Sequence, residues 1–427
     1  MTTVLHEAQF ELHPHPGNLH SGWLPRHDSA AMRAYVERVL GSERRELAPP
    51  VQALATYIQD NEVVRRLAST ACAEYLAAIG AQSPRLKDVD TLLHGFNATL
   101  TDAPCFIDGE LVGLPFPAFM AGVGRTVGGS ALFRQPTVHL LVSNILNDWH
   151  VFLDSPASSA GFLVYGEQWL APAVKKRYRF PLWSKDAGGP PCWNSWNAFL
   201  ARGFEDPGQA RPVADPESNE TVVCPGDGVR KDPLGYGAVH LADLLASPVP
   251  RQQALIDDYR LLERFTGGQV FQAHLTPYDF HRWWAPVNGD VLFDPFTIPG
   301  CFFNPPVSPG ARFATTPARS CQGHARGVIV IGTEDHGHVC CIPLGMSAAS
   351  SVVFDPGMRR GVRVRKGQEM GMFRQGGSSF VLLFEKLPDK ELVLVNADGM
   401  QDTRRQVLSS NRAVLAGARI GAWHARK

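Results

Sequence analysis

The 427-residue sequence lacks an excess of charge of one sign and a long apolar run. Lys and Arg together number 41, as do Asp and Glu, and a neutral chain has no long-range attraction to nucleic acid or to an anionic membrane surface. No apolar run reaches the length of about eighteen residues that a membrane helix needs, and residues 1–7 lack the basic start and apolar block of a signal peptide. We therefore expect no nucleic-acid partner and no integral membrane segment, and we predict a cytoplasmic protein.

Paired cysteines are also missing. None of the eight cysteines belongs to a CxxC pair, the spacing typical of structural zinc sites and redox-active dithiols. We therefore expect reduced, mostly buried thiols and no metal. The segment 334–340 contains five residues of metal-ligating type, but the charged tip of a β-hairpin explains them better.

Helical and β-prone segments divide the chain. The 33 prolines and 40 glycines concentrate after residue 180, which indicates a helical first half and a β-rich second half. Apolar spacing predicts helices over 32–40, 51–58, 63–76 and 136–152, the first capped by Asp28 or Ser29. Two apolar runs, 327–332 and 338–345, predict a hairpin. The predicted fold class is α+β, with an extended arm (1–25), a helical N-terminal domain (26–185), a loop boundary near 183–191 and a β-rich domain (190–427).

Two segments in the second half carry chemistry. In the segment 272–291, about a dozen positions combine His274 and His281 with an aspartate, an arginine and large aromatic residues. Such polar groups are costly to bury unless they are paired, so this density is more typical of a site-lining loop than of a core strand. Residues 376–379 read Gly-Gly-Ser-Ser between two apolar runs. A serine hydroxyl can attack a neighbouring flexible glycine carbonyl if the fold holds the peptide near the attack geometry, although the same letters occur in ordinary turns.

Taken in order, these segments resemble the phosphatidylserine decarboxylase family, whose members make a pyruvoyl cofactor from their own chain. The resemblance covers roughly residues 190–427. It also extends to a subfamily that has a helical first half and includes fungal L-tryptophan decarboxylase. The matching motifs are Arg211-Pro212, Pro-Gly-Asp-Gly at 225–228, the segment 275–289, Ile-Pro-Gly at 298–300, Lys-Gly-Gln-Glu-Met-Gly at 366–371, Gly-Gly-Ser-Ser at 376–379 and, in the first half, Gly-Trp-Leu at 22–24.

The resemblance implies a carboxy-lyase made as a zymogen. Ser378 would attack the Gly377 carbonyl, and this autocatalytic cleavage would leave a β chain (1–377) and an α chain (378–427) that stay associated, with Ser378 converted to a pyruvoyl group. The pyruvoyl ketone would accept the electrons released as CO2 leaves, so no metal or external cofactor is needed. The expected substrate is an amino-acid head group, either a free aromatic L-amino acid such as tryptophan or the phosphatidylserine of phospholipid biosynthesis.

The resemblance also assigns site residues, with one departure. Asp227 and His281 match the aspartate and the first histidine of the family and would serve Ser378. Trp284 stands where the family has a second histidine, the base in self-cleavage, and an indole has no basic nitrogen. His274 is a possible substitute base.

The departure at Trp284 leaves two functions open. The first is the pyruvoyl-dependent decarboxylase, with Phe280, Trp283 and Trp284 binding the substrate. The second is a catalytically inactive homologue that does not cleave itself and binds an amino acid or a lipid, with Trp283 and Trp284 filling the old site. A released 378–427 fragment would indicate the enzyme, and a single chain of 46.7 kDa would indicate the binding protein.

Overall fold

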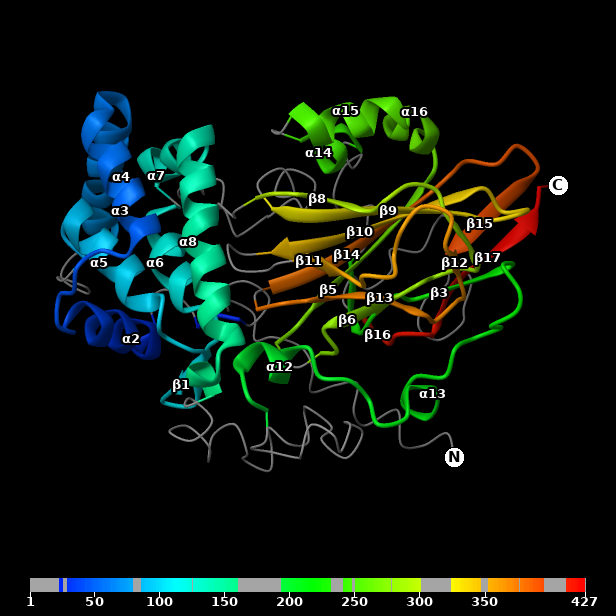
Figure 1. The fold of residues 1–427 in the computed structure, drawn as a ribbon, viewed down its shortest axis with the longest axis horizontal. Coiled ribbons are helices and arrows are strands. Elements are labelled where there is room, and N and C mark those ends of the chain that lie inside the picture. Colours follow the sequence, from blue (N-terminus) through cyan, green and yellow to red (C-terminus); the bar gives the residue numbers. More distant parts are fainter. Residues whose placement is uncertain are drawn as a thin grey trace.

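The structure is a computed structural model. Along the chain, most of the helices precede most of the strands (Figure 1). The structure describes residues 23–25, 29–79, 86–124, 126–159, 193–231, 241–247, 250–277, 279–300, 324–346, 352–375, 377–394 and 412–426. Figure 1 shows the helices of the first half at one end of the molecule and the sheets at the other. The predicted α+β class is therefore confirmed.

The helical part is built around one apolar core. All four predicted helices are present, and Ser29 caps the first of them by accepting a hydrogen bond from the Met32 backbone N–H (3.1 Å). Trp23 and Leu24, at the end of the expected arm, are buried in the same core. The elements are α2 (Ala30–Leu40), α3 (Pro49–Asp60), α4 (Glu62–Ile79), α5 (Val89–Thr99), β1 (Cys105–Ile107), β2 (Glu110–Val112), α6 (Pro115–Val123), α7 (Val127–Phe133), α8 (Pro136–Asp154) and the 3-10 turn Pro156–Ser159.

The short helix α12 (Trp196–Leu200) also packs into the helical core, together with Trp193. The sequence places these residues in the second domain, after a boundary at 183–191, and that boundary segment lies outside the described residues. The aromatic and leucine side chains of α12 face the core that α8 helps to form, because the helix is too short to bury them alone. A second short helix, α13 (Pro207–Ala210), follows.

A large antiparallel sheet dominates the second half. In the described part of the chain it has nine strands, and β14 lies in its middle, paired with β10 on one side and β5 on the other. The order is β12 (Arg363–Val364), β7 (Gly289–Val291), β9 (Ala325–Gly332), β10 (His338–Met346), β14 (Gly377–Phe384), β5 (Gln269–Leu275), β4 (Gly228–Lys231) and β16 (Arg412–Val414), with β8 (Phe296–Ile298) paired to β9.

Both faces of the large sheet are covered. Helices α14 (Leu241–Leu245), α15 (Pro250–Asp258) and α16 (Leu261–Phe265) lie over one face (Figure 1). The other face packs against β11 (Val352–Phe354), β13 (Glu369–Phe373) and β6 (Arg282–Trp284). A third sheet holds β15 (Lys390–Leu394), β17 (Arg419–Ala425) and β3 (Thr221–Val223). A central strand buried on both sides is expected to be apolar throughout, as β14 is after its serines.

The strands β9 and β10 form the hairpin that the sequence predicts. At its tip Glu334 is paired with Arg363 (2.9 Å), which also contacts Asp290 (3.3 Å). Within the described residues, no group of three or more metal-ligating side chains gathers there or elsewhere. The five described cysteines are buried thiols, and no described helix is long and apolar enough to span a bilayer.

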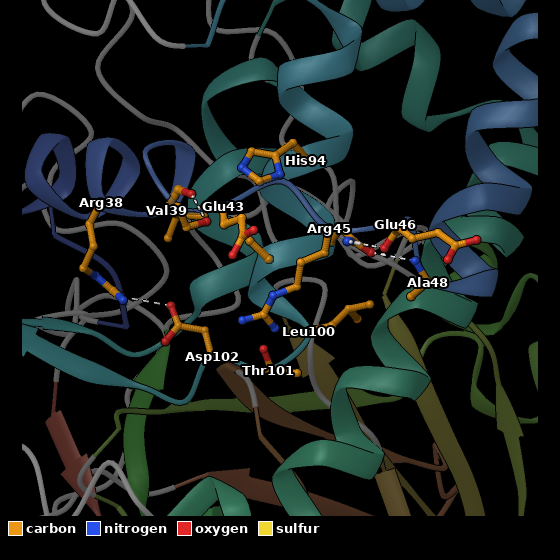
Figure 2. A pocket seen from close by; sticks show the side chains of 13 residues that line it. Arg38, Val39, Glu43, Arg45, Glu46, Ala48, His94, Leu100, Thr101 and Asp102 are labelled. Carbon is orange, nitrogen blue, oxygen red and sulfur yellow. Dashed lines mark hydrogen bonds and ion pairs between the residues drawn. The ribbon is translucent and has the colours of Figure 1, made fainter.

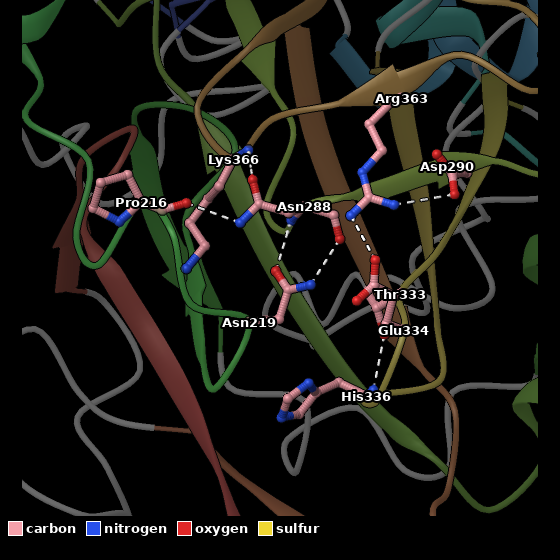
Figure 3. A network of polar contacts seen from close by, with 9 residues as sticks. All are labelled: Pro216, Asn219, Asn288, Asp290, Thr333, Glu334, His336, Arg363 and Lys366. Atoms are coloured by element: carbon pink, nitrogen blue, oxygen red, sulfur yellow. Dashed lines mark hydrogen bonds and ion pairs between the residues drawn. The ribbon is translucent and has the colours of Figure 1, made fainter.

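Two residues of the sequence motifs, Lys366 and Asn288, hold neighbouring segments together (Figure 3). The ammonium of Lys366 donates to the carbonyls of Ser218, Asp215 (2.7 Å) and Thr221 (2.7 Å). Burial lowers the pKa of Lys366 to about 8. Asn288 accepts from the Lys366 backbone N–H (2.9 Å). These contacts join residues 215–221 to the turn between β12 and β13, so we assign Lys366 and Asn288 structural roles.

Candidate active site

Ser378 lies buried at the start of β14. The residue is 1% exposed, and its backbone is paired with Leu275 on β5 and Gly345 on β10. Side chains opposite each other in an antiparallel pair share a face. Ser378 therefore shares the face of Leu275 and Phe380, which looks toward β6 and β13. The bond that the sequence predicts to be cut lies within a paired strand rather than in a surface turn.

Asp227 reaches the same end of the sheet. It immediately precedes β4, whose Val229 is paired with His274 near the end of β5. The glycines on either side of it permit this approach: a Cβ at Gly226 would lie 2.8 Å from the Phe380 ring, and one at Gly228 would lie 2.6 Å from the His274 carbonyl oxygen. The Pro-Gly-Asp-Gly motif thus brings a carboxylate to the strand ends, because no larger residue fits on either side of it.

The Asp227 carboxylate is held by a buried ion pair. The Arg211 guanidinium donates to both of its oxygens, from Nε (2.8 Å) and from Nη2 (2.5 Å). The Ala416 backbone N–H donates to the same carboxylate (3.0 Å). Both charged side chains are almost wholly buried, and Arg211 also stacks over the Phe204 ring (4.7 Å to the centroid). This bidentate geometry fixes the orientation of Asp227.

His281 presents a neutral acceptor nitrogen. Its Nδ1 lies 2.9 Å from the Asp279 carbonyl oxygen, which only accepts, so Nδ1 carries the proton and Nε2 keeps its lone pair. No hydrogen bond reaches Nε2 within the described part of the chain. Burial, followed by the charge of Arg202, lowers the pKa of His281 to about 3. The Trp23 indole packs edge-on against the imidazole (5.5 Å between centroids).

The register separates His274 from Ser378. His274 is paired with Ser379, the residue after the nucleophile, and successive residues of a strand point to opposite faces. The side chain of His274 therefore shares its face with Ser379 and Gln272, on the side covered by α14 to α16. This placement argues against His274 as the substitute base.

The three aromatic residues predicted to bind substrate do not form one surface. Phe280 and Trp284 are in contact (5.7 Å between centroids), and Phe280 packs on Phe204 (4.5 Å). Trp283 instead lies between the two sheets against Phe354 (5.4 Å). Because adjacent strand residues alternate, only Phe280 and Trp284 stay together, in a small cluster beside Arg211.

Comparison with known proteins identifies the family. The sequence model described as phosphatidylserine decarboxylase matches residues 196–421, more than half of the chain. The chain belongs to the phosphatidylserine decarboxylase family. A second model of the same description matches residues 48–178, a range that includes α3 to α8.

Three relatives illustrate the range of this phosphatidylserine decarboxylase family. The protein named decarboxylase iboD of Amanita muscaria is 26% identical over 64% of this chain and 84% of its own length. The L-tryptophan decarboxylase of Psilocybe cyanescens is 24% identical over 86% of this chain and 88% of its own. The phosphatidylserine decarboxylase proenzyme of Chlamydia muridarum is 29% identical over 55% of this chain and 74% of its own length. The chain is accordingly a carboxy-lyase of this family.

Several residues at this family site were not predicted from the sequence as functional. The sequence marks Arg211 only as part of a motif, because its contact with Asp227 depends on a fold that joins positions sixteen residues apart. The carboxyl of Asp279 is a second such group. Its Oδ2 accepts from the Thr276 backbone N–H (2.6 Å), directly after the β5 residue that pairs with Ser378. The density of polar residues in 272–291 was the available signal for Asp279.

A pocket of about 400 Å³ in the helical part is separate from this site (Figure 2). Inside it, Asp102 accepts hydrogen bonds from Arg38 (3.0 Å) and from the Tyr35 hydroxyl (2.9 Å). None of the residues predicted to act in catalysis lines it. We therefore assign the pocket no part in the decarboxylase chemistry.

Asp279 should make stability depend on pH. Burial, followed by the charge of Asp227, raises the pKa of Asp279 to about 6 from its ordinary value of 3.8. Because ionisation is harder in the folded state, the free energy of unfolding should fall by up to about 3 kcal/mol as pH rises from about 4 to about 6. Asp279→Asn keeps an acceptor for Thr276 and should lose this decrease.

The measurement is urea unfolding at about pH 4 and about pH 7, with and without Asp279→Asn, in chains that also carry Ser378→Ala and so stay whole. The lowered pKa of His281 acts in both chains and cancels in the comparison. An equal effect of Asp279→Asn at the two pH values would contradict the assignment.

Proposed function

We propose that the chain is a pyruvoyl-dependent decarboxylase that makes its cofactor by cleaving itself between Gly377 and Ser378. One observation supports this most directly: a buried serine begins a central strand at the sheet end where Asp227 and the 276–281 loop with His281 also lie. The family's proenzyme relatives support the same reading.

The proposed cleavage is an acyl shift followed by an elimination. The Ser378 Oγ loses its proton and bonds to the Gly377 carbonyl carbon, while the peptide C–N bond breaks and the nitrogen takes a proton. Loss of the Ser378 α-proton then breaks the Cβ–Oγ bond and releases the Gly377 carboxylate. The dehydroalanine that is left takes up water and releases ammonia, which gives the pyruvoyl end of the α chain.

The surroundings of Ser378 fit such a group. The position is buried and shares its face with Leu275 and Phe380, so water is largely excluded. The loop that directly follows Leu275 carries His281, whose Nε2 is a buried acceptor. When formed, the pyruvoyl group supplies a ketone that binds the substrate amine and accepts the electrons released with CO2.

We assign His281 as the acceptor of the Ser378 proton, since Trp284 has no basic nitrogen and His274 lies on the other face of the sheet. Asp227, whose charge is balanced by Arg211, contributes a fixed carboxylate acceptor at the strand ends. Phe280 and Trp284 offer apolar surface beside the site.

A free aromatic L-amino acid is the substrate that we propose. The relative named L-tryptophan decarboxylase aligns with 86% of this chain, including the helical part, whereas the phosphatidylserine decarboxylase proenzyme aligns with 55%. The aromatic cluster of Phe204, Phe280 and Trp284 is consistent with an aromatic side chain nearby. Mass spectrometry of the amines formed from tryptophan, tyrosine, phenylalanine and phosphatidylserine tests this choice. Production of phosphatidylethanolamine alone would overturn it.

Purified protein should separate into two chains on denaturing electrophoresis. Intact mass should show a 378–427 fragment that is blocked at its N-terminus by the pyruvoyl group, and the Ser378→Ala variant should stay a single chain of 46.7 kDa. The reason is that alanine removes the only oxygen that attacks Gly377 in the proposed step. A wild-type chain that stays whole after prolonged incubation, while folded, would contradict the proposed function.

A further inference from the structure

The residue two positions before Gly377 is held by the helical part of the chain. Gln375 is fully buried. Its backbone N–H donates to Asn197 Oδ1 (3.0 Å), its side-chain Nε2 donates to the Gly113 carbonyl, and its Oε1 accepts from Trp196 Nε1. Every one of these partners lies in or beside the helical core, on α12 or directly after β2.

The neighbouring residue is held by the same helices. Arg374 forms an ion pair with Asp154 (3.1 Å), the last residue of α8. The other Asp154 oxygen accepts from Asn197 Nδ2 (2.8 Å), which links the Arg374 contact to the Gln375 contact. Figure 1 shows α8 beside the ends of β10 and β14. We call Gln375, Arg374, Asn197 and Asp154, with the Trp196 and Gly113 contacts, the helical clamp.

The clamp holds one side of the bond that is proposed to be cut. On the other side, Ser378 is fixed by its pairing with β5 and β10. Between the two anchors the sequence has only Gly376 and Gly377, and glycine has the widest range of backbone conformations. Attack by a hydroxyl on a carbonyl requires the two atoms at about 3 Å in the right orientation, and a displacement of about 1 Å can lower a rate about 100-fold.

We infer that the helical part positions the self-cleavage segment, with Gln375 as the main positioning residue. Gln375 touches no reacting atom. Its side-chain nitrogen, its side-chain oxygen and its backbone N–H all form hydrogen bonds in one buried network. A fully bonded buried network of this kind holds the chain in one position. This inference rests on the proposed function and adds to it a role for the helices in maturation of the precursor.

The test follows self-cleavage of freshly purified precursor by intact mass against time. Gln375→Ala should slow cleavage by about 10-fold to 100-fold, and Asn197→Ala should slow it by a similar factor. Arg374→Ala removes a half-exposed ion pair, so it should fold normally and have a smaller effect.

Gln375→Glu provides a readout that a loss of stability would not give. A carboxylate cannot donate to the Gly113 carbonyl, but a protonated carboxyl can donate there and still accept from Trp196. The ratio of the wild-type rate to the variant rate should therefore fall as pH is lowered from about 8 to about 5. A ratio independent of pH would mean that the donated hydrogen bond does not matter.

Asn97→Ala is the matched control. Asn97 also bridges backbone groups of the helical part, accepting from the Ala48 N–H (2.8 Å) and donating to the Glu46 carbonyl (3.1 Å), but it makes no clamp contact. It should lower the melting temperature without slowing cleavage. Equal slowing in Asn97→Ala and Asn197→Ala would overturn the inference, as would wild-type cleavage rates in folded Gln375→Ala and Asn197→Ala. A wild-type chain that never cleaves would overturn the proposed function. The inference about the helical clamp would then be overturned as well, because it depends on that cleavage.

Discussion

Replacing His281 with alanine is expected to slow self-cleavage of the precursor by about 100-fold to 10,000-fold, the usual contribution of a positioned proton acceptor. The imidazole donates through Nδ1 to the Asp279 carbonyl, which leaves Nε2 as a buried acceptor. Trp284, in the same segment, cannot replace His281, because an indole has no basic nitrogen.

The matched control is His274→Ala. This histidine is also buried and lies within the same twenty-residue segment, but the register points it to the opposite face from Ser378. It should change the cleavage rate by no more than a few-fold. Cleavage is followed by intact mass after expression at low temperature, with melting temperatures of both variants measured in parallel. Rapid cleavage in His281→Ala and slow cleavage in His274→Ala would reverse our assignment.

The sequence predicts the order of the fold and much of the site because both rest on local patterns. Apolar spacing predicts the helices of the first half, and the two apolar runs predict the hairpin of β9 and β10. The motif residues Ser378, Asp227 and His281 are found in loops and strand starts that the fold brings to one end of the large sheet.

What the sequence does not reveal is which side of a strand each residue takes and which distant segment meets it. Nothing in the sequence shows whether His274 lies on the same face of the sheet as Ser378. The register of β5 and β14 puts them on opposite faces. Trp283 and Trp284 differ in the same way. The contact of Gln375 with Gly113 spans 262 residues, and no local pattern in either segment indicates it.

The pairing of Arg211 with Asp227 gives the second large expected effect. Arg211→Met should lower the free energy of unfolding by about 3–5 kcal/mol, because it leaves a carboxylate buried without its partner. Asp227→Asn alone should also be destabilising, since Arg211 then keeps an unpaired buried charge. Urea unfolding of both variants in the Ser378→Ala background, where the chain stays whole, measures the two costs.

The double variant Arg211→Met with Asp227→Asn separates structure from chemistry. With both charges removed, neither is left uncompensated, and most of the stability lost in Arg211→Met should return. If Asp227 also takes part in the reaction, the double variant with Ser378 intact should fold and still fail to cleave, whereas a purely structural ion pair predicts that cleavage returns with stability. If the free energy of unfolding lost in the double variant equals the sum of the losses in the two single variants, the two side chains are not coupled. That result would contradict the bidentate contact between them. Because Asp227 lies at the sheet end where Ser378 begins β14, we expect recovered stability without recovered cleavage.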